Sequence, residues 1–357
     1  MTDQPETDGP TTSPSGPDGL DDRLRALADE LNHALIEQLT SRGELTTPAW
    51  RAAFEAMPRH LFAPRFTLPQ NLGGHTHDIT STLVDATSAT SVDGAARREE
   101  WLRAVYRNEA LLTEFDETGV ATTSCSAPSV VATMLEASQT TDRDTVLEIG
   151  TGTGWTAALL THRLGADAVT SVDVDPRCFT GARERLDRLG LAPALAVADG
   201  YLGYPARAPY DRIIATAALR KIPPAWLAQT RAGGTILTDL RGNFAGNLAL
   251  LTVDTDQTGQ VAHGRFLPAT ARFMPLRSTA QPFDHLAELS ARAVNEPGDH
   301  RPTSLDPATL RDRDRAFAFL AQLALPGVDA GHVIHKGPDG RTMYFCLTDP
   351  TPTHGHA

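Results

Sequence analysis

The 357-residue sequence contains few cysteines and no long apolar run. Its three cysteines, Cys125, Cys178 and Cys346, are odd in number, widely spaced and without a C-x-x-C pair. This excludes a disulfide framework and favours a reducing compartment, so we expect a cytoplasmic protein. No apolar stretch approaches the roughly 18 residues that a membrane-spanning helix needs, so we expect no membrane partner.

Positive charge is also scarce. The chain carries 32 Lys and Arg against 44 Asp and Glu, a formal net charge of -12, and only Lys221 and Lys336 are lysines. Because binding to nucleic-acid phosphates needs clustered Lys and Arg, this balance argues against a nucleic-acid partner. An acidic protein is compatible with a basic or neutral peptide substrate.

Composition and periodicity predict four regions. Residues 1–18 are rich in Pro, Gly, Ser, Thr and acidic residues, lack the pattern of a signal peptide, and are expected to form a disordered tail. Residues 19–115 are predicted to be a helical region with a loop insertion, and residues 116–278 the main α/β domain. Residues 279–357 form a C-terminal extension, for which substrate recognition and plain packing are equally open roles.

Local patterns predict several elements outside the main domain. Leucines at helical spacing predict a helix over 20–41, and Thr47 is expected to cap a second helix that begins at Pro48. Further helices are predicted over 99–112, 128–137 and 308–324, and a strand over 342–348, in each case from the spacing of apolar residues.

The polar segment 67–98 shows no clear period and is predicted to be a long loop. It contains His75, His77 and Asp78, which could be interpreted as a metal cluster. No further ligands at helical or strand spacing accompany them, so a solvated loop is favoured and no metal is expected.

The most informative stretch is Val-Leu-Glu-Ile-Gly-Thr-Gly-Thr-Gly-Trp at 146–155. A buried strand runs into three alternating glycines, which adopt positive φ at little cost, and a helix follows whose N-terminal amides face the loop. The spacing G-x-G-x-G differs from the G-x-G-x-x-G of dinucleotide folds. Together with Glu148, it resembles motif I of S-adenosylmethionine (SAM) methyltransferases.

Two further strand ends agree with that resemblance. The strand over 169–175 ends in acidic residues, of which Asp173 is expected to bind the ribose hydroxyls and Asp175 to cap the next helix. The strand over 195–197 leads to Asp199 and Gly200, where a carboxylate could accept from the adenine amino group. A surface-turn role for Asp173 or Asp199 is the alternative in each case.

The order of several blocks resembles the protein-L-isoaspartate O-methyltransferase family. The blocks are Pro58–Pro64, Cys125-Ser126-Ala127-Pro128, the two SAM motifs at 146–155 and 169–176, Asp199-Gly200, Pro209-Tyr210-Asp211, Ile222-Pro223-Pro224, Gly233-Gly234, Arg265–Pro268 and Arg272–Leu276. The resemblance spans about residues 45–277. It implies a Rossmann-like α/β fold with a mostly parallel, seven-stranded sheet covered by helices on both faces, SAM as methyl donor and S-adenosyl-L-homocysteine (SAH) as product.

The layout of the chain resembles that of the subgroup of this family that tailors ribosomally made peptides. The features that carry this resemblance are the long N-terminal part, the 67–98 insertion, the tail and the Arg272–Arg277 region. They favour the graspetide-associated branch over the lanthipeptide branch. The leading hypothesis is therefore methylation of an aspartate side chain in such a peptide, which leads to aspartimide or isoaspartate. Repair of isoaspartyl proteins and a non-catalytic SAM-binding scaffold are the alternatives.

The chemistry requires placement more than a base. A carboxylate with a pKa near ~4 is already a nucleophile at neutral pH, so a hydroxyl that orients it, such as Ser126, suffices. Ser126 could instead cap the helix that begins near Pro128. The expected cofactor residues are Glu148, Gly150, Thr151, Gly152, Thr153, Gly154, Trp155, Asp173, Val174, Asp199 and Gly200. The expected substrate residues are Ser124, Cys125, Ser129 and Thr216, with Cys125 favoured as a packing residue over a nucleophile.

Overall fold

A computed structural model describes most of the chain between residues 19 and 348. The described residues are 19–68, 83–85, 94–117, 119–241, 246–257, 259–269, 271–278, 329–337 and 340–348. The chain divides into two compact units, Met1–Val197 and Ala198–Ala357, and this division falls inside the predicted 116–278 domain. The predicted tail 1–18, the cluster of His75, His77 and Asp78, and the predicted helix 308–324 lie outside the described residues.

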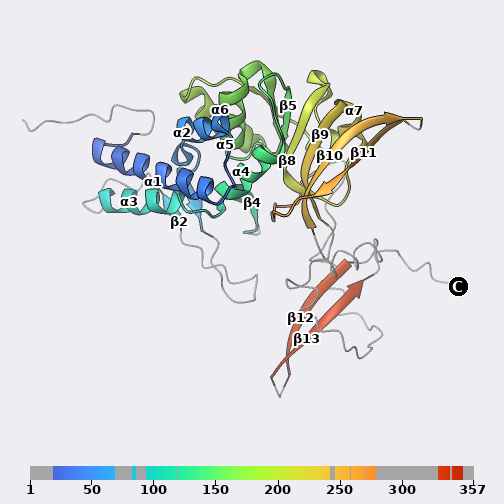
Figure 1. The fold of residues 1–357 in the computed structure, drawn as a ribbon. Coiled ribbons are helices and arrows are strands. Elements are labelled where there is room, and N and C mark those ends of the chain that lie inside the picture. Colours follow the sequence, from blue (N-terminus) through green and yellow to red (C-terminus); the bar gives the residue numbers. More distant parts are fainter. Residues whose placement is uncertain are drawn as a thin grey trace, which may run out of the picture. The chain divides into compact units, whose positions relative to one another are not determined.

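The first unit begins with the predicted leucine-rich helix. Asp21 caps helix α1 (Asp22–Ser41), since its side chain accepts a hydrogen bond from the Leu24 amide. The helix buries Leu24, Leu35 and Leu39. It packs along α3 (Gly94–Val105), and the two helices lie side by side in Figure 1. Among the described residues, no helix is long and apolar enough to cross a membrane.

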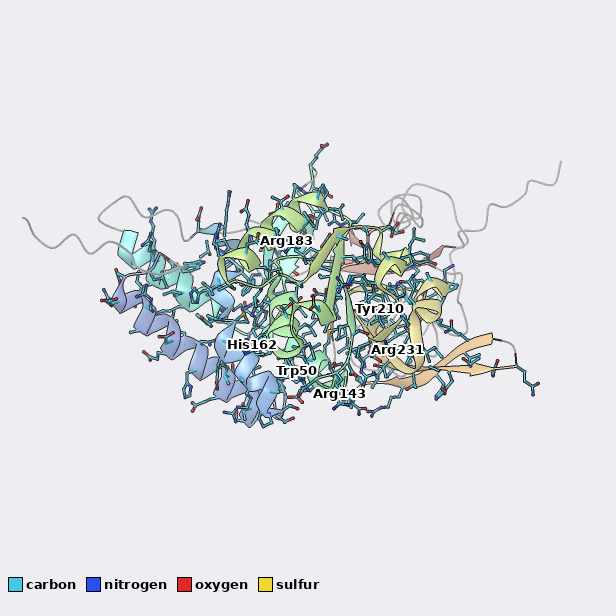
Figure 2. The ribbon with its side chains drawn as sticks, turned by 90° about the horizontal axis from the view of Figure 1, so that it is seen from above. Trp50, Arg143, His162, Arg183, Tyr210 and Arg231 are labelled. Carbon is cyan, nitrogen blue, oxygen red and sulfur yellow. The ribbon has the colours of Figure 1, made fainter. Side chains whose placement is uncertain are left out.

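Helix α2 (Pro48–Ala56) also begins where expected, but Thr47 does not cap it with its side chain. The Thr47 hydroxyl instead donates to Glu136 Oε2 over 2.6 Å. Helix α2 packs against α5 (Trp155–Leu164); Figure 2 labels Trp50 on α2 and His162 on α5. The next residue, Arg163, places its guanidinium 4.1 Å from the centre of the Trp50 ring.

A short 3-10 turn, η1 (Arg59–Leu61), leads from these helices to a four-stranded antiparallel sheet in the order β2-β1-β3-β4. The strands are β1 (Arg65–Thr67), β2 (Leu83–Asp85), β3 (Leu111–Phe115) and β4 (Ala121–Cys125). The predicted helix over 99–112 is therefore wrong at its C-terminal end, because Leu111 and Leu112 pair with β4. The predicted loop over 67–98 is likewise wrong at 83–85, which pairs with β1, and at 94–98, which begin α3.

The remaining part of the first unit follows the predicted alternation of strands and helices. Strands β5 (Val146–Ile149), β6 (Val169–Asp173) and β7 (Ala194–Val197) are parallel and neighbours in that order. Helix α4 (Pro128–Ala137) precedes them, α5 and the turn η2 (Ala166–Ala168) follow β5, and α6 (Pro176–Arg188) follows β6. All four residues of β5 are buried, which explains why three of them are apolar; the fourth is Glu148.

The second unit begins with two short turns, η3 (Gly200–Leu202) and η4 (Pro205–Arg207). Strand β8 (Tyr210–Leu219) then pairs in parallel with β9 (Thr230–Arg241), and α7 (Pro224–Gln229) connects them. Strands β10 (Gly246–Asp256) and β11 (Gly259–Phe266) continue antiparallel from β9. Figure 2 labels Tyr210 and Arg231, near the starts of β8 and β9.

The predicted fold class is confirmed. The seven-stranded sheet has the order β11-β10-β9-β8-β5-β6-β7, and its pairs β5–β6, β6–β7 and β8–β9 are parallel. The second unit also contains an antiparallel hairpin, β12 (Asp329–Gly337) and β13 (Gly340–Thr348). Strand β13 confirms the strand predicted over 342–348.

Candidate functional site

The glycine loop lies at the carboxyl end of β5, as predicted. Gly150, Gly152 and Gly154 have φ values of 98°, 52° and 88°, which only glycine adopts without strain. A Cβ on Gly154 would lie 3.0 Å from the Ala182 Cβ, so this glycine also allows close packing of α6. The Gly150 and Thr151 amides both donate to the Val172 carbonyl, which ties the loop to β6.

Asp173 lies at the end of β6 and holds the loop from the other side. Its Oδ2 accepts from the Gly152 amide at 2.9 Å, and its Oδ1 accepts from the Asp175 amide at 3.0 Å. The side chain is only 9% exposed. Asp175 caps α6 through the Arg177 amide, which confirms its predicted role. Val174, between the two acids, is partly exposed.

Glu148 is the most deeply buried of the predicted site residues. Its side chain is 0% exposed, its Oε2 accepts from the Ser171 hydroxyl at 2.5 Å, and its Oε1 has no hydrogen-bond partner among the described residues. Burial, together with the nearby charge of Asp173, raises the pKa of Glu148 to about 8, although the Ser171 hydrogen bond acts in the opposite direction. This carboxyl group therefore has one oxygen without a partner among the described residues.

The two threonines of the loop have structural partners. The Thr151 hydroxyl is 2.7 Å from the Ser171 hydroxyl, and the Thr153 carbonyl accepts from Arg185 Nη1 at 3.3 Å. Both threonines are buried. The loop is thus held by β6 and α6 without any bound molecule.

The predicted substrate segment lies against this loop. A Cβ on Gly152 would lie 3.5 Å from the Ser124 carbonyl oxygen and 3.6 Å from Thr123 Cγ2. The structure therefore brings together two motifs that are more than twenty residues apart in the chain. Cys125 is buried, in agreement with a packing role, whereas Ser124, Ser126 and Ser129 are partly exposed.

The helix after this segment is not capped by Ser126. The residue that precedes α4 is Ala127, and no side chain of that position caps the helix. The Ser129 amide in the first turn instead donates to Asn108 Oδ1 at 2.9 Å. The Ser126 hydroxyl has no hydrogen-bond partner among the described residues, so the capping alternative is wrong and the hydroxyl is available to a substrate.

The side chain of Trp155 does not lie beside the glycine loop, where it was predicted to contact the cofactor. Its ring is buried against Phe54, with ring centres 5.4 Å apart, and its Nε1 donates to the Met57 carbonyl at 2.9 Å. The indole therefore joins α5 to α2 and belongs to the core. Only the backbone of Trp155, at the start of α5, adjoins the glycine loop.

Sequence reasoning missed Arg59, whose guanidinium is fully buried. It donates to five backbone carbonyl oxygens, among them those of Cys125 and Ser126 at 2.9 and 2.8 Å. The Pro58–Pro64 block pointed to this turn, but the sequence contains no signal for acceptors that lie 46 to 67 residues away.

In the second unit, Asp199 precedes η3 and accepts from the Tyr201 amide at 3.0 Å and from the Ser278 hydroxyl at 2.8 Å. Gly200 is buried, and its carbonyl accepts from Trp226 Nε1 at 2.8 Å. Thr216 lies in β8 and is partly exposed. Within the described ranges, no group of three or more His, Cys, Asp or Glu residues could hold a metal ion.

Comparison with known proteins decides the family. A family profile described as Protein-L-isoaspartate(D-aspartate) O-methyltransferase (PCMT) matches residues 76–281, more than half of the chain. The chain belongs to this family. Among curated relatives, the Protein-L-isoaspartate O-methyltransferase of Ignicoccus hospitalis is 43% identical over 114 residues, which cover 31% of this chain and 54% of that protein. Protein-L-isoaspartate O-methyltransferase 1 of Cupriavidus necator is 38% identical over 152 residues, 42% of this chain and 57% of that protein.

This PCMT-family chain therefore spans about half the length of those two relatives. Coverage is greater for Protein-L-isoaspartate O-methyltransferase 1 of Nitrosospira multiformis, which is 35% identical over 48% of this chain and 69% of its own length. A solved structure named protein-L-isoaspartate O-methyltransferase aligns with a TM-score of 0.52 and 21% identity, over 90% of this chain and 88% of that chain. That likeness supports the fold.

Proposed function

We propose that this protein is a SAM-dependent carboxyl O-methyltransferase that acts on isoaspartyl residues of proteins or peptides. The observation that carries the proposal is the contact between Ser124 and the glycine loop at Gly152, within a chain of the PCMT family. It supports the proposal because the segment that we expect to bind the methyl acceptor adjoins the loop that we expect to bind the methyl donor. Repair of isoaspartyl proteins, the alternative from the sequence, thus ranks above peptide tailoring, since the curated relatives carry that family name.

The residues of the first unit fit SAM. The positive-φ glycines leave bare backbone for a ligand, and Asp173 is held in place by two amides while its carboxylate oxygens can accept further hydrogen bonds. Glu148 Oε1 lacks a partner among the described residues, and a cationic amino group that reached it would favour the ionised carboxylate. Bound SAM would supply a methyl group from its positively charged sulfur. The roles of Asp199, Gly200 and Thr216 stay predictions from the sequence.

The chain's own contribution to the reaction is placement. A substrate carboxylate is ionised at neutral pH, so no general base is needed and none is assigned. The Ser126 hydroxyl can donate one hydrogen bond that orients the carboxylate, at little desolvation cost. The resulting methyl ester is open to attack by the following backbone nitrogen, because methoxide leaves more readily than hydroxide. This closes a five-membered imide and releases methanol.

A second candidate is methylation of one aspartate side chain in a ribosomally made, graspetide-type precursor peptide, including a precursor that is already macrocyclised. It is favoured by parts of the chain outside both residues 76–281 and the resemblance over 45–277, namely α1 and the β12–β13 hairpin. These parts could present a constrained peptide. A SAM-binding scaffold without catalysis is the third hypothesis from the sequence.

The test is a labelled transfer experiment with the full chain. Methyl-labelled SAM is incubated with an isoaspartyl peptide, with the same peptide containing ordinary aspartate, and with a macrocyclic aspartyl peptide joined by a side-chain ester. We expect base-labile methyl ester, detected by mass spectrometry, on the isoaspartyl peptide alone. Ester or methanol loss on the macrocyclic peptide alone would favour tailoring, and SAM binding without transfer to any peptide would favour the scaffold.

A further inference from the structure

Arg59 connects three segments of the first unit by hydrogen bonds to backbone carbonyls. Nη1 donates to Val105 at 2.8 Å and to Arg107 at 2.9 Å. Nη2 donates to Glu109 at 2.7 Å, to Cys125 at 2.9 Å and to Ser126 at 2.8 Å. One side chain thus joins the end of α3, the approach to β3 and the turn between β4 and α4.

The environment of Arg59 is costly for a cation. The side chain is fully buried, and no carboxylate of the described residues forms an ion pair with it. Burial lowers the pKa of Arg59, and the neighbouring Cys125, Tyr106 and Glu109 act in the opposite direction. The positive charge of Arg59 is stabilised by the dipoles of the carbonyl groups and by the Trp155 ring, whose centre is 5.5 Å away.

Two of the carbonyl groups that accept from Arg59 Nη2 flank the Cα of Ser126 and constrain the backbone there. The Cys125 carbonyl belongs to the peptide plane before the Ser126 Cα, and the Ser126 carbonyl belongs to the plane after it. Because one nitrogen binds both oxygens, the relative orientation of the two planes is held, and with it the φ and ψ of Ser126. The position of the Ser126 Cβ, which carries the hydroxyl, is therefore held by Arg59.

From this geometry we infer that Arg59 is a positioning residue for methyl transfer: it holds the Ser126 hydroxyl in place without touching the substrate. The inference rests on the proposed function, since it assigns Arg59 to the same site. Arg59 also contacts Trp155, which begins the helix after the glycine loop, so it links the substrate turn to the donor loop.

Arg163 offers a matched control within the same unit. Its guanidinium also lies over a tryptophan ring, that of Trp50, and donates to a backbone carbonyl, that of Thr140. It has no contact with the Ser126 turn among the described residues. A purely structural role for Arg59 predicts that Arg59→Lys and Arg163→Lys behave alike.

The experiment compares the full-length wild type with Arg59→Lys, Arg163→Lys, Ser126→Ala and the double variant Arg59→Lys/Ser126→Ala. With SAM and an isoaspartyl peptide, we expect Arg59→Lys and Ser126→Ala each to lower kcat roughly 10-fold or more, the size of one hydrogen bond to a charged group. The SAH Kd should stay within about threefold of the wild type, because the glycine loop is unchanged. The double variant should lose no more than either single variant, since both changes remove the same placement.

Additive losses in the double variant, or an equal loss of kcat in Arg163→Lys, would overturn the inference. Arg59→Gln, which avoids a buried charge yet keeps N–H donors, serves if Arg59→Lys does not fold. Hydrogen exchange tests the inference apart from activity: the amides of Ser126, Ala127 and Ser129 should exchange at least tenfold faster in the Arg59 variants but not in Arg163→Lys. Unchanged exchange would also overturn it, whereas a wild type without methyl transfer would overturn only the proposed function.

Discussion

Glu148 is a carboxyl group whose ionisation the fold opposes. It lies in the wholly buried strand β5, with Ser171 as its hydroxyl donor, and its pKa is raised to about 8 mainly by burial. Its ordinary pKa is 4.5. Between those two pH values the folded chain retains a proton that the unfolded chain has released, so folding becomes less favourable as the pH rises.

We therefore expect the free energy of unfolding of the ligand-free protein to fall between pH 4.5 and pH 8, by at most about 1.4 kcal/mol per pH unit from this group. Glu148→Gln should lack that slope and be more stable than the wild type at pH 8 by roughly a few kcal/mol. Denaturant unfolding across this pH range measures both proteins. Equal slopes would show that Glu148 titrates normally in the folded chain.

At the scale of elements, the start of α2 is held by a residue from α4. Glu136 Oε1 accepts from the Thr46 and Thr47 amides at 2.7 Å each, and Oε2 accepts from the Thr47 hydroxyl at 2.6 Å. Burial acts to raise the pKa of Glu136, but these hydrogen bonds outweigh it, so the pKa is lowered from 4.5. The carboxylate anchors the segment before α2 and binds the Thr47 hydroxyl, which therefore does not cap the helix.

Because the folded pKa of Glu136 is depressed, its contribution is present above pH 4.5 and is lost as the pH falls below that value. We expect Glu136→Gln to lower stability at pH 7 by about 1–2 kcal/mol, after discounting for partial exposure to solvent. The difference from the wild type should shrink on acidification. Thermal unfolding at pH 7 and pH 3.5 checks this, and a constant difference would mean that charge plays no part in the contact.

Elements with local signals could be predicted from the sequence, and those made by distant pairing could not. The run from β5 to β7 follows from buried strands, the glycine loop and the Asp175 cap, all encoded within a few neighbouring residues. Leu111 and Leu112 have helical spacing with the preceding apolar residues, yet their pairing with β4 places them in a strand. The bonds of Arg59 span 46 to 67 residues and left no local signal.

At the scale of the whole molecule, the sequence predicts those parts of the site in which a recognisable motif lies at the end of a strand. Glu148, Asp173 and the three glycines lie as expected at the carboxyl ends of β5 and β6, because parallel strands present their ends at one edge of a sheet. The ring of Trp155 turned inward instead, since the N-terminal helices supply Phe54 and the Met57 carbonyl as its partners. That outcome depends on tertiary packing and not on the motif.

The central claim is that the glycine loop and Asp173 hold SAM and its product, and calorimetric titration of the full chain with SAH tests it most directly. We predict saturable heat from a single site, and stabilisation against unfolding of about 2.7 kcal/mol when free SAH exceeds its Kd 100-fold. Asp173→Asn should fold and bind SAH more weakly, because it removes the negative charge and turns one of the two accepting oxygens into an NH2 donor. Folded wild-type protein that gives no heat and no stabilisation with SAH would contradict the account.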